Sequence, residues 1–444
     1  MSSMPTNSCI AGLLNGSKYG NISVGVYSIF HVEFGVESTD HHHKSFASHV
    51  QKQAQNKKDG ILKLLFHYPF FKVGGAEMSS LRLMTALADR GHDITLVVTT
   101  GGGELEEALD GRIRLVRLRP SMYGAKFLGA RGLLARSAAL PDFLAYLTAR
   151  AIGGIRMLPF FLRRYDASAT LLHGTSTWFC RRVVRAPSRM HFIRNDLKHV
   201  DPSGRVAKAI RHAEPEIDYY VCVSQTAHQS LIAAVPETAP KATVVYNILN
   251  PDEMRQRMTK GGDPFPPRRG DELRILTVCR LSEMAKGLTR MVRVCQRLAD
   301  AGLAFRWFVV GDGNDRALLE NAIRKAGLEN RIILMGRFSN PFPAYVHADV
   351  VAMVSYYEGL CGMVNEAKIA GRAVVATKVS GIDEQLVDGE TGLIVDNNED
   401  AIVEGMQRVL TDTKLRSKIS NDYLPPALLD DEAKLDKLEQ MMQG

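Results

Sequence analysis

A strand–helix–strand unit near residue 60 restricts the possible folds more than any other part of the sequence. Residues 61–67 form an apolar run typical of a buried strand, residues 78–90 have the spacing of an amphipathic helix, and residues 94–99 again predict a buried strand. Strands that are joined through a helix pair in parallel. The sequence therefore predicts an α/β protein built on a parallel sheet.

The same alternation starts again after residues 261–270, a stretch rich in proline and glycine that is typical of a linker. Further strands are predicted at residues 274–278, 306–310, 332–335, 350–354, 373–377 and 393–395. A chain of 444 residues also exceeds the size that one hydrophobic core usually supports. We therefore predict two doubly wound domains, residues 61–255 and 256–420.

Two terminal segments lie outside these domains. Residues 1–60 show little hydrophobic pattern, and we expect an extension that is partly disordered. Its three consecutive histidines, His41 to His43, could bind a metal, but a solvated cluster without function is the simpler interpretation. Residues 421–444 contain a predicted helix, which we expect to pack back on the first domain.

The cysteines indicate a reduced compartment. The six cysteines are scattered without a CxxC pair, which argues against disulfides and against a cysteine metal site. No apolar run reaches the roughly 18 residues of a membrane span, and the N-terminus lacks the pattern of a signal peptide. We therefore expect a cytoplasmic protein without a cysteine-bound metal.

The charge points to an anionic partner without identifying it. A net charge of +8 is compatible with nucleic acid, an acidic membrane surface or phosphorylated ligands. Residues 123–165 mix large apolar residues with arginines and contain a single acid, Asp142. Two interpretations fit this segment: contact with an anionic membrane, or helices packed in the domain with solvated arginines. Basic and aromatic residues do not interleave on any recognisable module, which argues against nucleic acid.

Residues 350–371 carry the clearest binding pattern. An apolar strand runs into a loop with Gly359 and Gly362, and a helix follows from residue 363. Free backbone N–H groups at such a helix start bind phosphate well. Glu358 and Glu366, eight positions apart, bracket this loop, and carboxylates accept hydrogen bonds from the vicinal hydroxyls of sugars. The alternative is an ordinary strand–helix unit with two exposed glutamates.

Two further loops are predicted at ligand-binding edges of the sheets. Arg280 and Lys286 lie in the loop after the first strand of the second domain, where they can meet a diphosphate. Gly74 and Gly75, in the sequence GGAE, precede the first helix and permit close approach to its N-terminus. GGAE is not the G-x-G-x-x-G fingerprint, which argues against a nicotinamide-dependent oxidoreductase.

Taken together, seven motifs resemble the retaining GT-B glycosyltransferases of family 4, over residues 61–410 and most specifically in the second half. The motifs are GGAE (residues 74–77, with RGHDIT after it), VSQ…VVYNILNP (223–251), RLSEMAKG (280–287), VVGDG (309–313), GRFSNPF (336–342), EGLCGMVNEAKIAGRAVVAT (358–377) and SGIDEQLVDGETGLIV (380–395). The resemblance implies two Rossmann-like domains that face each other across a cleft.

The resemblance also implies roles for individual residues. Arg280 and Lys286 would bind the donor diphosphate and stabilise it as leaving group, Glu358 would hold the transferred sugar, and Glu366 the ribose hydroxyls. The residues expected to line the rest of the donor site are Gly74, Gly75, Arg337, Phe338, Gly359, Leu360, Cys361 and Gly362. The implied activity needs no metal and moves a sugar from a UDP- or GDP-sugar to a glycan or lipid-linked acceptor, as in bacterial surface-polysaccharide assembly.

Two departures from the family pattern qualify this expectation. The segment from Arg280 to Lys286 has one residue more than the commonest spacing. Many relatives have a histidine where this chain has Arg194, so its role would fall to Arg194, to Asp196 or to no residue at all. An alternative is therefore a catalytically silent, glycosyltransferase-like subunit that binds a partner, although Arg280, Lys286, Glu358 and Glu366 argue against it.

Overall fold

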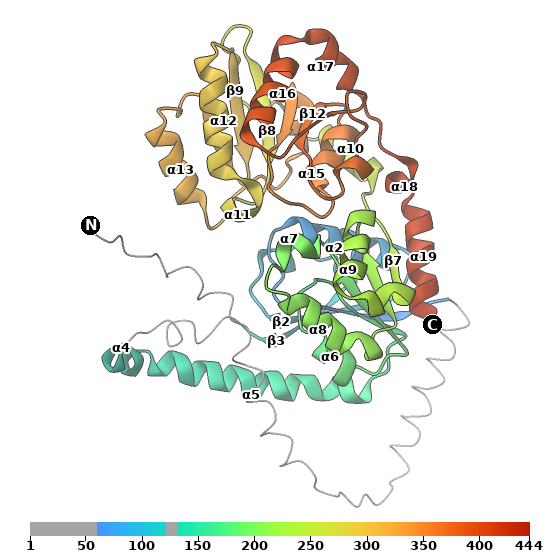
Figure 1. The fold of residues 1–444 in the computed structure, drawn as a ribbon. Helices are drawn as coiled ribbons and strands as arrows, with labels where there is room; N and C mark the ends of the chain where they lie inside the picture. Colours follow the sequence, from blue (N-terminus) through green and yellow to red (C-terminus); the bar gives the residue numbers. More distant parts are fainter. Residues whose placement is uncertain (1–59, 121–131) are drawn as a thin grey trace, which may run out of the picture. The chain divides into compact units, whose positions relative to one another are not determined.

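The computed structural model describes residues 60–120 and 132–444, without the side chains of residues 133–135. The extension predicted before residue 60, with its histidines, and the first part of the basic apolar segment lie outside these residues. Two parallel sheets, each with helices on both faces, make up the described chain (Figure 1). The prediction of two doubly wound α/β domains is confirmed.

The first sheet has seven parallel strands in the order β3-β2-β1-β4-β5-β6-β7. The strands are β1 (Lys63–Tyr68), β2 (Asp93–Thr100), β3 (Arg114–Arg119), β4 (Ala167–Thr170), β5 (Ser188–Ile193), β6 (Tyr219–Cys222) and β7 (Ala242–Val244). The chain reverses its direction of winding between β1 and β4. The crevice at the carboxyl ends of these two strands is where such sheets bind ligands.

The helices of the first sheet are α2 (Gly75–Asp89), α4 (Leu133–Ala138), α5 (Leu140–Leu162), α6 (Trp178–Arg182), α7 (Leu197–Val200), α8 (Arg205–Ala213) and α9 (Gln225–Ala234). Helix α2 begins three residues before the predicted start, so Gly74 is its N-cap residue. This position brings the glycine pair to the helix end that faces the ligand edge.

The second sheet has six parallel strands in the order β10-β9-β8-β11-β12-β13, and its winding reverses between β8 and β11. The strands are β8 (Leu273–Val278), β9 (Phe305–Val310), β10 (Ile332–Gly336), β11 (Val350–Met353), β12 (Ala373–Thr377) and β13 (Leu393–Val395). The helices are α10 (Pro251–Met258), α11 (Glu283–Lys286), α12 (Leu288–Asp300), α13 (Arg316–Lys325), α14 (Phe342–His347), α15 (Gly362–Ile369), α16 (Glu399–Thr411), α17 (Thr413–Ile419) and α18 (Pro426–Leu429). Two apolar cores lie on the two faces of this sheet.

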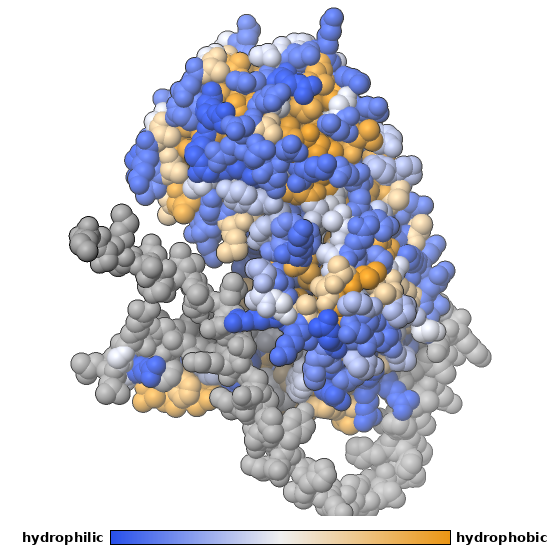
Figure 2. Space-filling model, in the orientation of Figure 1, coloured by the Kyte–Doolittle hydropathy of each residue, from blue (hydrophilic) through white to orange (hydrophobic). Residues whose placement is uncertain are grey.

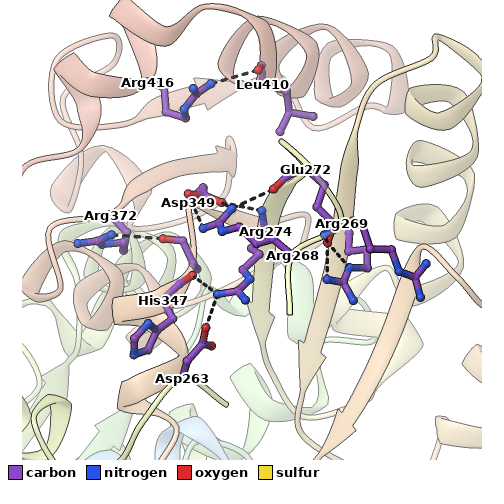
Figure 3. Close-up of polar contacts among 12 residues, drawn as sticks. Asp263, Arg268, Arg269, Glu272, Arg274, His347, Asp349, Arg372, Leu410 and Arg416 are labelled. Carbon is purple, nitrogen blue, oxygen red and sulfur yellow. Dashed lines mark hydrogen bonds and ion pairs between the residues drawn. The ribbon is translucent and has the colours of Figure 1, made fainter. Parts of the chain in front are cut away.

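Ion pairs fix the segment between the two sheets to the amino-terminal edge of the second sheet (Figure 3). Arg268 contacts Asp349 at 2.7 Å, and Arg274 contacts Asp263 at 2.7 Å. Each of these arginines has a carboxylate partner, and the cluster lies at the edge opposite to the carboxyl ends of the strands. The cluster therefore anchors the linker rather than forming a ligand site.

The C-terminal helix α19 (Asp431–Gln443) packs on the first sheet. Its apolar residues Leu435, Leu438 and Met441 belong to the core of that sheet, and the Ser188 hydroxyl donates a hydrogen bond to the Met441 carbonyl at 2.7 Å. Within the described part of the chain, no helix combines the length and hydropathy needed to cross a membrane.

Candidate active site

The winding reversal of the second sheet brings the predicted cationic residues together. Arg280 follows β8 by two residues, and Lys286 ends the one-turn helix α11, in a segment that was predicted as a plain loop. Glu358 follows β11, the neighbour of β8. The ends of these two strands are therefore the positions from which a bound anion would be contacted.

Lys286 and Glu358 form an ion pair. The Lys286 Nζ lies 2.5 Å from Glu358 Oε1, which also accepts a hydrogen bond from the Ser355 hydroxyl at 2.6 Å. Burial favours the neutral amine, but the Glu358 carboxylate outweighs it and raises the pKa of Lys286. Lys286 is therefore a fixed cation. Only one of its three N–H donors is used by a described residue, so the others are available to a ligand.

Gly287 is the residue that lets Lys286 reach this position. It has φ +61°, in the left-handed region, where glycine alone is unstrained. A Cβ here would lie 3.0 Å from the Val354 carbonyl oxygen. The chain can therefore turn from α11 into α12 directly against β11.

Arg280 lies opposite the N-terminus of α2. Its side chain is exposed and forms no ion pair with a described residue. A Cβ on Gly74 would lie 3.6 Å from Arg280 Nη1 and 2.4 Å from Glu77 Oε2. Gly74 therefore leaves room for the Glu77 carboxylate, which lies at the N-terminus of α2 and whose pKa is raised by burial. The exposed Arg280 guanidinium suits an anion.

The N-terminus of α15 is held rigidly by a residue that sequence reasoning missed. Gln385 accepts a hydrogen bond from the Cys361 N–H at 3.1 Å and donates one to the Cys361 carbonyl at 2.8 Å. It also donates to Asn365 Oδ1 at 2.6 Å. Leu360 and Cys361 are buried, whereas Gly362, the first helical residue, is exposed. The loop before α15 is therefore fixed, and Gly362 at the helix start is open to solvent.

Gly359 is in backbone contact with the first sheet's loops. A Cβ at this position would lie 2.2 Å from the Arg194 carbonyl oxygen and 2.9 Å from the Asn195 Cα. Backbone atoms on both sides cannot move aside as a flexible side chain would. The loop between Glu358 and α15 therefore requires glycine here.

Replacing Gly359 by alanine is expected to lower activity by roughly 10-fold or more, because a methyl group would push the two loops apart by more than the ~1 Å that catalytic geometry tolerates. Gly111→Ala is the matched control, because a Cβ there meets no atom within 4 Å. Turnover and thermal unfolding of both variants would be measured. Equal activity of Gly359→Ala and wild type would contradict the contact.

Glu366 accepts hydrogen bonds from both sheets' helices. Its Oε1 lies 3.0 Å from Arg82 Nη2, on α2, and its Oε2 lies 2.7 Å from the Tyr345 hydroxyl, on α14. Burial and the Glu366 carboxylate raise the pKa of Tyr345 well above its ordinary value, so the phenol stays protonated and donates. Arg82 was not predicted, because its helical position alone does not distinguish it from a solvated arginine.

The side chains of Arg194 and Asp196 are occupied by hydrogen bonds to other protein groups. The Arg194 guanidinium is buried and donates to the Leu171 carbonyl, Ser79, Ser80 and Asn247 at 2.7–3.1 Å. Burial lowers the pKa of Arg194 to about 10, so it remains protonated at neutral pH. All these partners lie in the first domain. Because Ser79 and Ser80 belong to α2, Arg194 holds this helix in place.

Asp196 caps α7 and accepts a hydrogen bond from the Ser380 hydroxyl at 2.7 Å. Burial opposes its ionisation, but this bond and those from the Lys198 N–H and His199 outweigh burial and lower the pKa of Asp196. Asp196 therefore connects a loop of the first sheet with a loop of the second, and its oxygens are already engaged.

Arg337 and Phe338 follow β10, at the same edge as Arg280. Arg337 is exposed and lies 3.5 Å from Glu104, and Phe338 packs on a core of the second sheet. The described residues include no group of three or more His, Cys, Asp or Glu side chains placed to hold a metal ion. The cations at this edge of the second sheet are therefore Arg280, Lys286 and Arg337, of which Lys286 and Arg337 lie beside carboxylates.

Comparison with solved structures identifies the fold. An Anabaena protein in complex with UDP and glucose has a TM-score of 0.60 and 18% sequence identity, over 86% of this chain and 98% of that chain. A lipopolysaccharide-biosynthesis glycosyltransferase superposes with a TM-score of 0.57 at 14% identity, over 86% of this chain and 100% of that chain. With the paired doubly wound sheets, these likenesses define the GT-B glycosyltransferase fold.

Family models then identify the domains. The model "Glycosyltransferase Family 4" matches residues 73–253, and "Glycosyl transferases group 1" matches residues 263–422. An uncharacterized glycosyltransferase of Methanocaldococcus jannaschii is 25% identical over 82% of this chain and 92% of its own length. A lipopolysaccharide core biosynthesis glycosyltransferase of Rhizobium meliloti is 24% identical over 80% of this chain and 91% of its own. The chain is a glycosyltransferase enzyme that carries both of these domains.

Proposed function

We propose that this glycosyltransferase moves a sugar, with retention of anomeric configuration, from a nucleotide diphosphate donor to a glycan or lipid-linked acceptor in cell-surface polysaccharide assembly. The observation that carries the proposal is the arrangement of Arg280, Lys286 and the α15 N-terminus around the winding reversal of the second sheet. It offers a bidentate cation, a point charge and the positive end of a helix dipole, which together suit a diphosphate.

The carboxylates complete the donor site. Glu358 is held by Lys286 and Ser355, which leaves Oε2 to accept a hydrogen bond from the transferred sugar. Glu366 lies one helix turn into α15 and would accept hydrogen bonds from the ribose. As the bond between sugar and phosphate breaks, Arg280 and Lys286 would stabilise the charge that develops on the leaving diphosphate. This scheme uses no metal ion and assigns the acceptor to the first domain.

The test is product analysis with purified protein. UDP-, GDP-, ADP- and CDP-sugars would be incubated with membrane lipid extract or oligosaccharide acceptors, followed by NMR of the anomeric proton. We expect release of one nucleoside diphosphate and a product with the donor's anomeric configuration. An inverted product would refute retention, and the absence of both transfer and donor hydrolysis would favour the partner-binding subunit.

We also propose that the enzyme binds the cytosolic face of an anionic membrane through α5 and meets its acceptor there. One face of α5 packs on β3, through Ala149, Gly153 and Phe160. The opposite face exposes a row of large apolar side chains at helical spacing. The row contains Leu140, Leu144, Leu147, Ile155, Leu158 and Leu162.

The exposure of this row is high: Leu162 is 81% exposed and Ile155 66%. Figure 2 shows hydrophobic surface at the position that the first part of α5 occupies in Figure 1. Residues 132–165 contain five arginines and one acid, Asp142. An apolar row flanked by arginines fits an anionic lipid surface, where the side chains enter the acyl boundary and the arginines meet headgroups.

Introducing charge on this face is expected to weaken binding to anionic vesicles by roughly 10-fold or more, since each buried leucine or isoleucine contributes about 1.5–3 kcal/mol. The variant is Leu144→Glu/Ile155→Glu/Leu158→Glu, and the control is Leu318→Glu/Val387→Glu, which alters exposed apolar residues of the second domain. Sedimentation with phosphatidylcholine vesicles, with and without phosphatidylglycerol, would be compared.

Equal sedimentation of wild type and triple variant would refute the assignment. A wild-type dimer that the triple variant dissociates, without vesicle binding, would instead show that this face joins two copies of the chain. Donor hydrolysis without acceptor is expected to be unchanged in the triple variant.

A further inference from the structure

Arg82 reaches from the first sheet's helix α2 to Glu366 on α15 of the second sheet. The Arg82 Nη2 lies 3.0 Å from Glu366 Oε1, and the two side chains are only 16% and 14% exposed. Exposed ion pairs contribute little, but a pair this shielded is screened less and holds its partners in place. The carboxylate proposed to bind ribose is therefore held by a residue of the other domain.

This ion pair belongs to a set of contacts between the same two groups of loops. The Glu384 carboxylate accepts hydrogen bonds from the Gln225 and Thr226 N–H groups at 2.8 and 3.1 Å, at the start of α9. It also accepts one from the Tyr246 hydroxyl at 3.0 Å. Together with the bond between Ser380 and Asp196, these contacts join loops of the first sheet to the segment that follows β12 in the second.

The spacing on α2 matches the parts of a nucleotide. Gly75 and Arg82 are seven residues apart, so they lie on one face of the helix. The rise between them is about 10 Å. Gly75 lies at the helix N-terminus, beside the proposed diphosphate site. One helix of the first domain thus faces the diphosphate at its start and the ribose carboxylate two turns later.

We propose that Arg82 is a positioning residue for donor recognition, acting through Glu366; this rests on the proposed function. Arg82 and the Tyr345 hydroxyl each bind one oxygen of Glu366, which fixes the plane of the carboxylate. Each oxygen keeps a lone pair for one ribose hydroxyl. Recognition of the ribose diol therefore depends on the position of α2. Donor binding is in this way coupled to the contact between the two domains.

The test compares binding of UDP, GDP, ADP and CDP with that of their 2′,3′-dideoxy counterparts, by titration calorimetry. In the wild type we expect the preferred nucleoside diphosphate to bind roughly 10-fold or more tighter than its dideoxy form, since two hydrogen bonds to a charged group are lost. In Arg82→Ala we expect this ratio to fall to about 3-fold or less, with unchanged affinity for the dideoxy form. Arg82→Lys should restore part of the ratio.

Arg90→Ala is the matched control: it removes an arginine at the other end of α2, where the partners Asp436 and Glu432 lie on α19. Its ratio should equal that of the wild type. An unchanged ratio in Arg82→Ala, an equal loss for both ligand forms, or tighter nucleotide binding would overturn the proposal, the last by showing that Arg82 blocks the site.

Glu366→Ala separates this proposal from the function on which it rests. If Glu366→Ala loses the ratio and Arg82→Ala keeps it, only the positioning role fails. If Glu366→Ala keeps the ratio as well, the ribose contact assigned to Glu366 fails together with the positioning role. If no nucleoside diphosphate binds to the wild type, the proposed function itself fails.

Discussion

Lys286→Ala is expected to lower turnover by roughly 100-fold or more without unfolding the protein. The ammonium lies 2.5 Å from Glu358, at the reversal point of the second sheet, and its pKa is raised by that carboxylate. It is therefore protonated across the neutral range, and its charge is preorganised before the donor arrives. Removing it takes a cation from the leaving diphosphate and leaves Glu358, 13% exposed, without its ion-pair partner.

The measurement is steady-state release of nucleoside diphosphate, with thermal unfolding measured in parallel. Lys325→Ala is the control, because Lys325 is an exposed lysine of the same domain, at the end of α13. The loss should appear in kcat as well as in kcat/KM, since the interaction strengthens as charge develops on the leaving group. A variant that is folded and retains near wild-type kcat would refute the assignment of Lys286.

Glu366→Ala is expected to lower kcat/KM by roughly 100-fold, through loss of two charge-assisted hydrogen bonds to the ribose. The substitution also leaves Arg82 and the Tyr345 hydroxyl without their shared acceptor. In contrast to Lys286→Ala, most of the effect should appear in the donor KM, because the ribose does not change charge during the reaction.

Glu390→Ala provides the comparison, since Glu390 is an exposed glutamate in a loop of the same domain. Initial rates over a range of donor concentrations would separate KM from kcat. If Glu366→Ala and Glu390→Ala show the same kcat/KM, Glu366 does not contact the donor.

The sequence was sufficient to predict both sheets, but not every edge strand in them. Buried parallel strands are continuous apolar runs, so β1, β8 and β11 are visible in the sequence. Strand β3, with the sequence RLVRLR, was missed: it is an edge strand whose arginines interrupt the apolar pattern. The start of α2 at Gly75 was also missed, because glycine has low helix propensity and no side chain caps this helix.

The site was predictable where a residue follows a strand end, as Arg280 and Glu358 do. Site residues could not be predicted where their role depends on a contact with a helix or loop distant in the sequence. Gln385 holds the Cys361 backbone, and Arg82 holds Glu366, but neither contact leaves a periodic signal in the sequence. Arg194 replaces a histidine of many relatives in the motif, and the structure shows four hydrogen bonds from its guanidinium, all to residues of the first domain.

Titration with nucleotides tests the central claim most directly. Wild type, Arg280→Ala and Lys286→Ala would be titrated with UDP, GDP, ADP and CDP and with the corresponding nucleosides. We predict that one diphosphate binds the wild type at least 10-fold more tightly than its nucleoside, and that this difference is reduced in both variants. Equal binding of diphosphate and nucleoside, or a difference that survives both substitutions, would contradict a diphosphate site formed by Arg280 and Lys286.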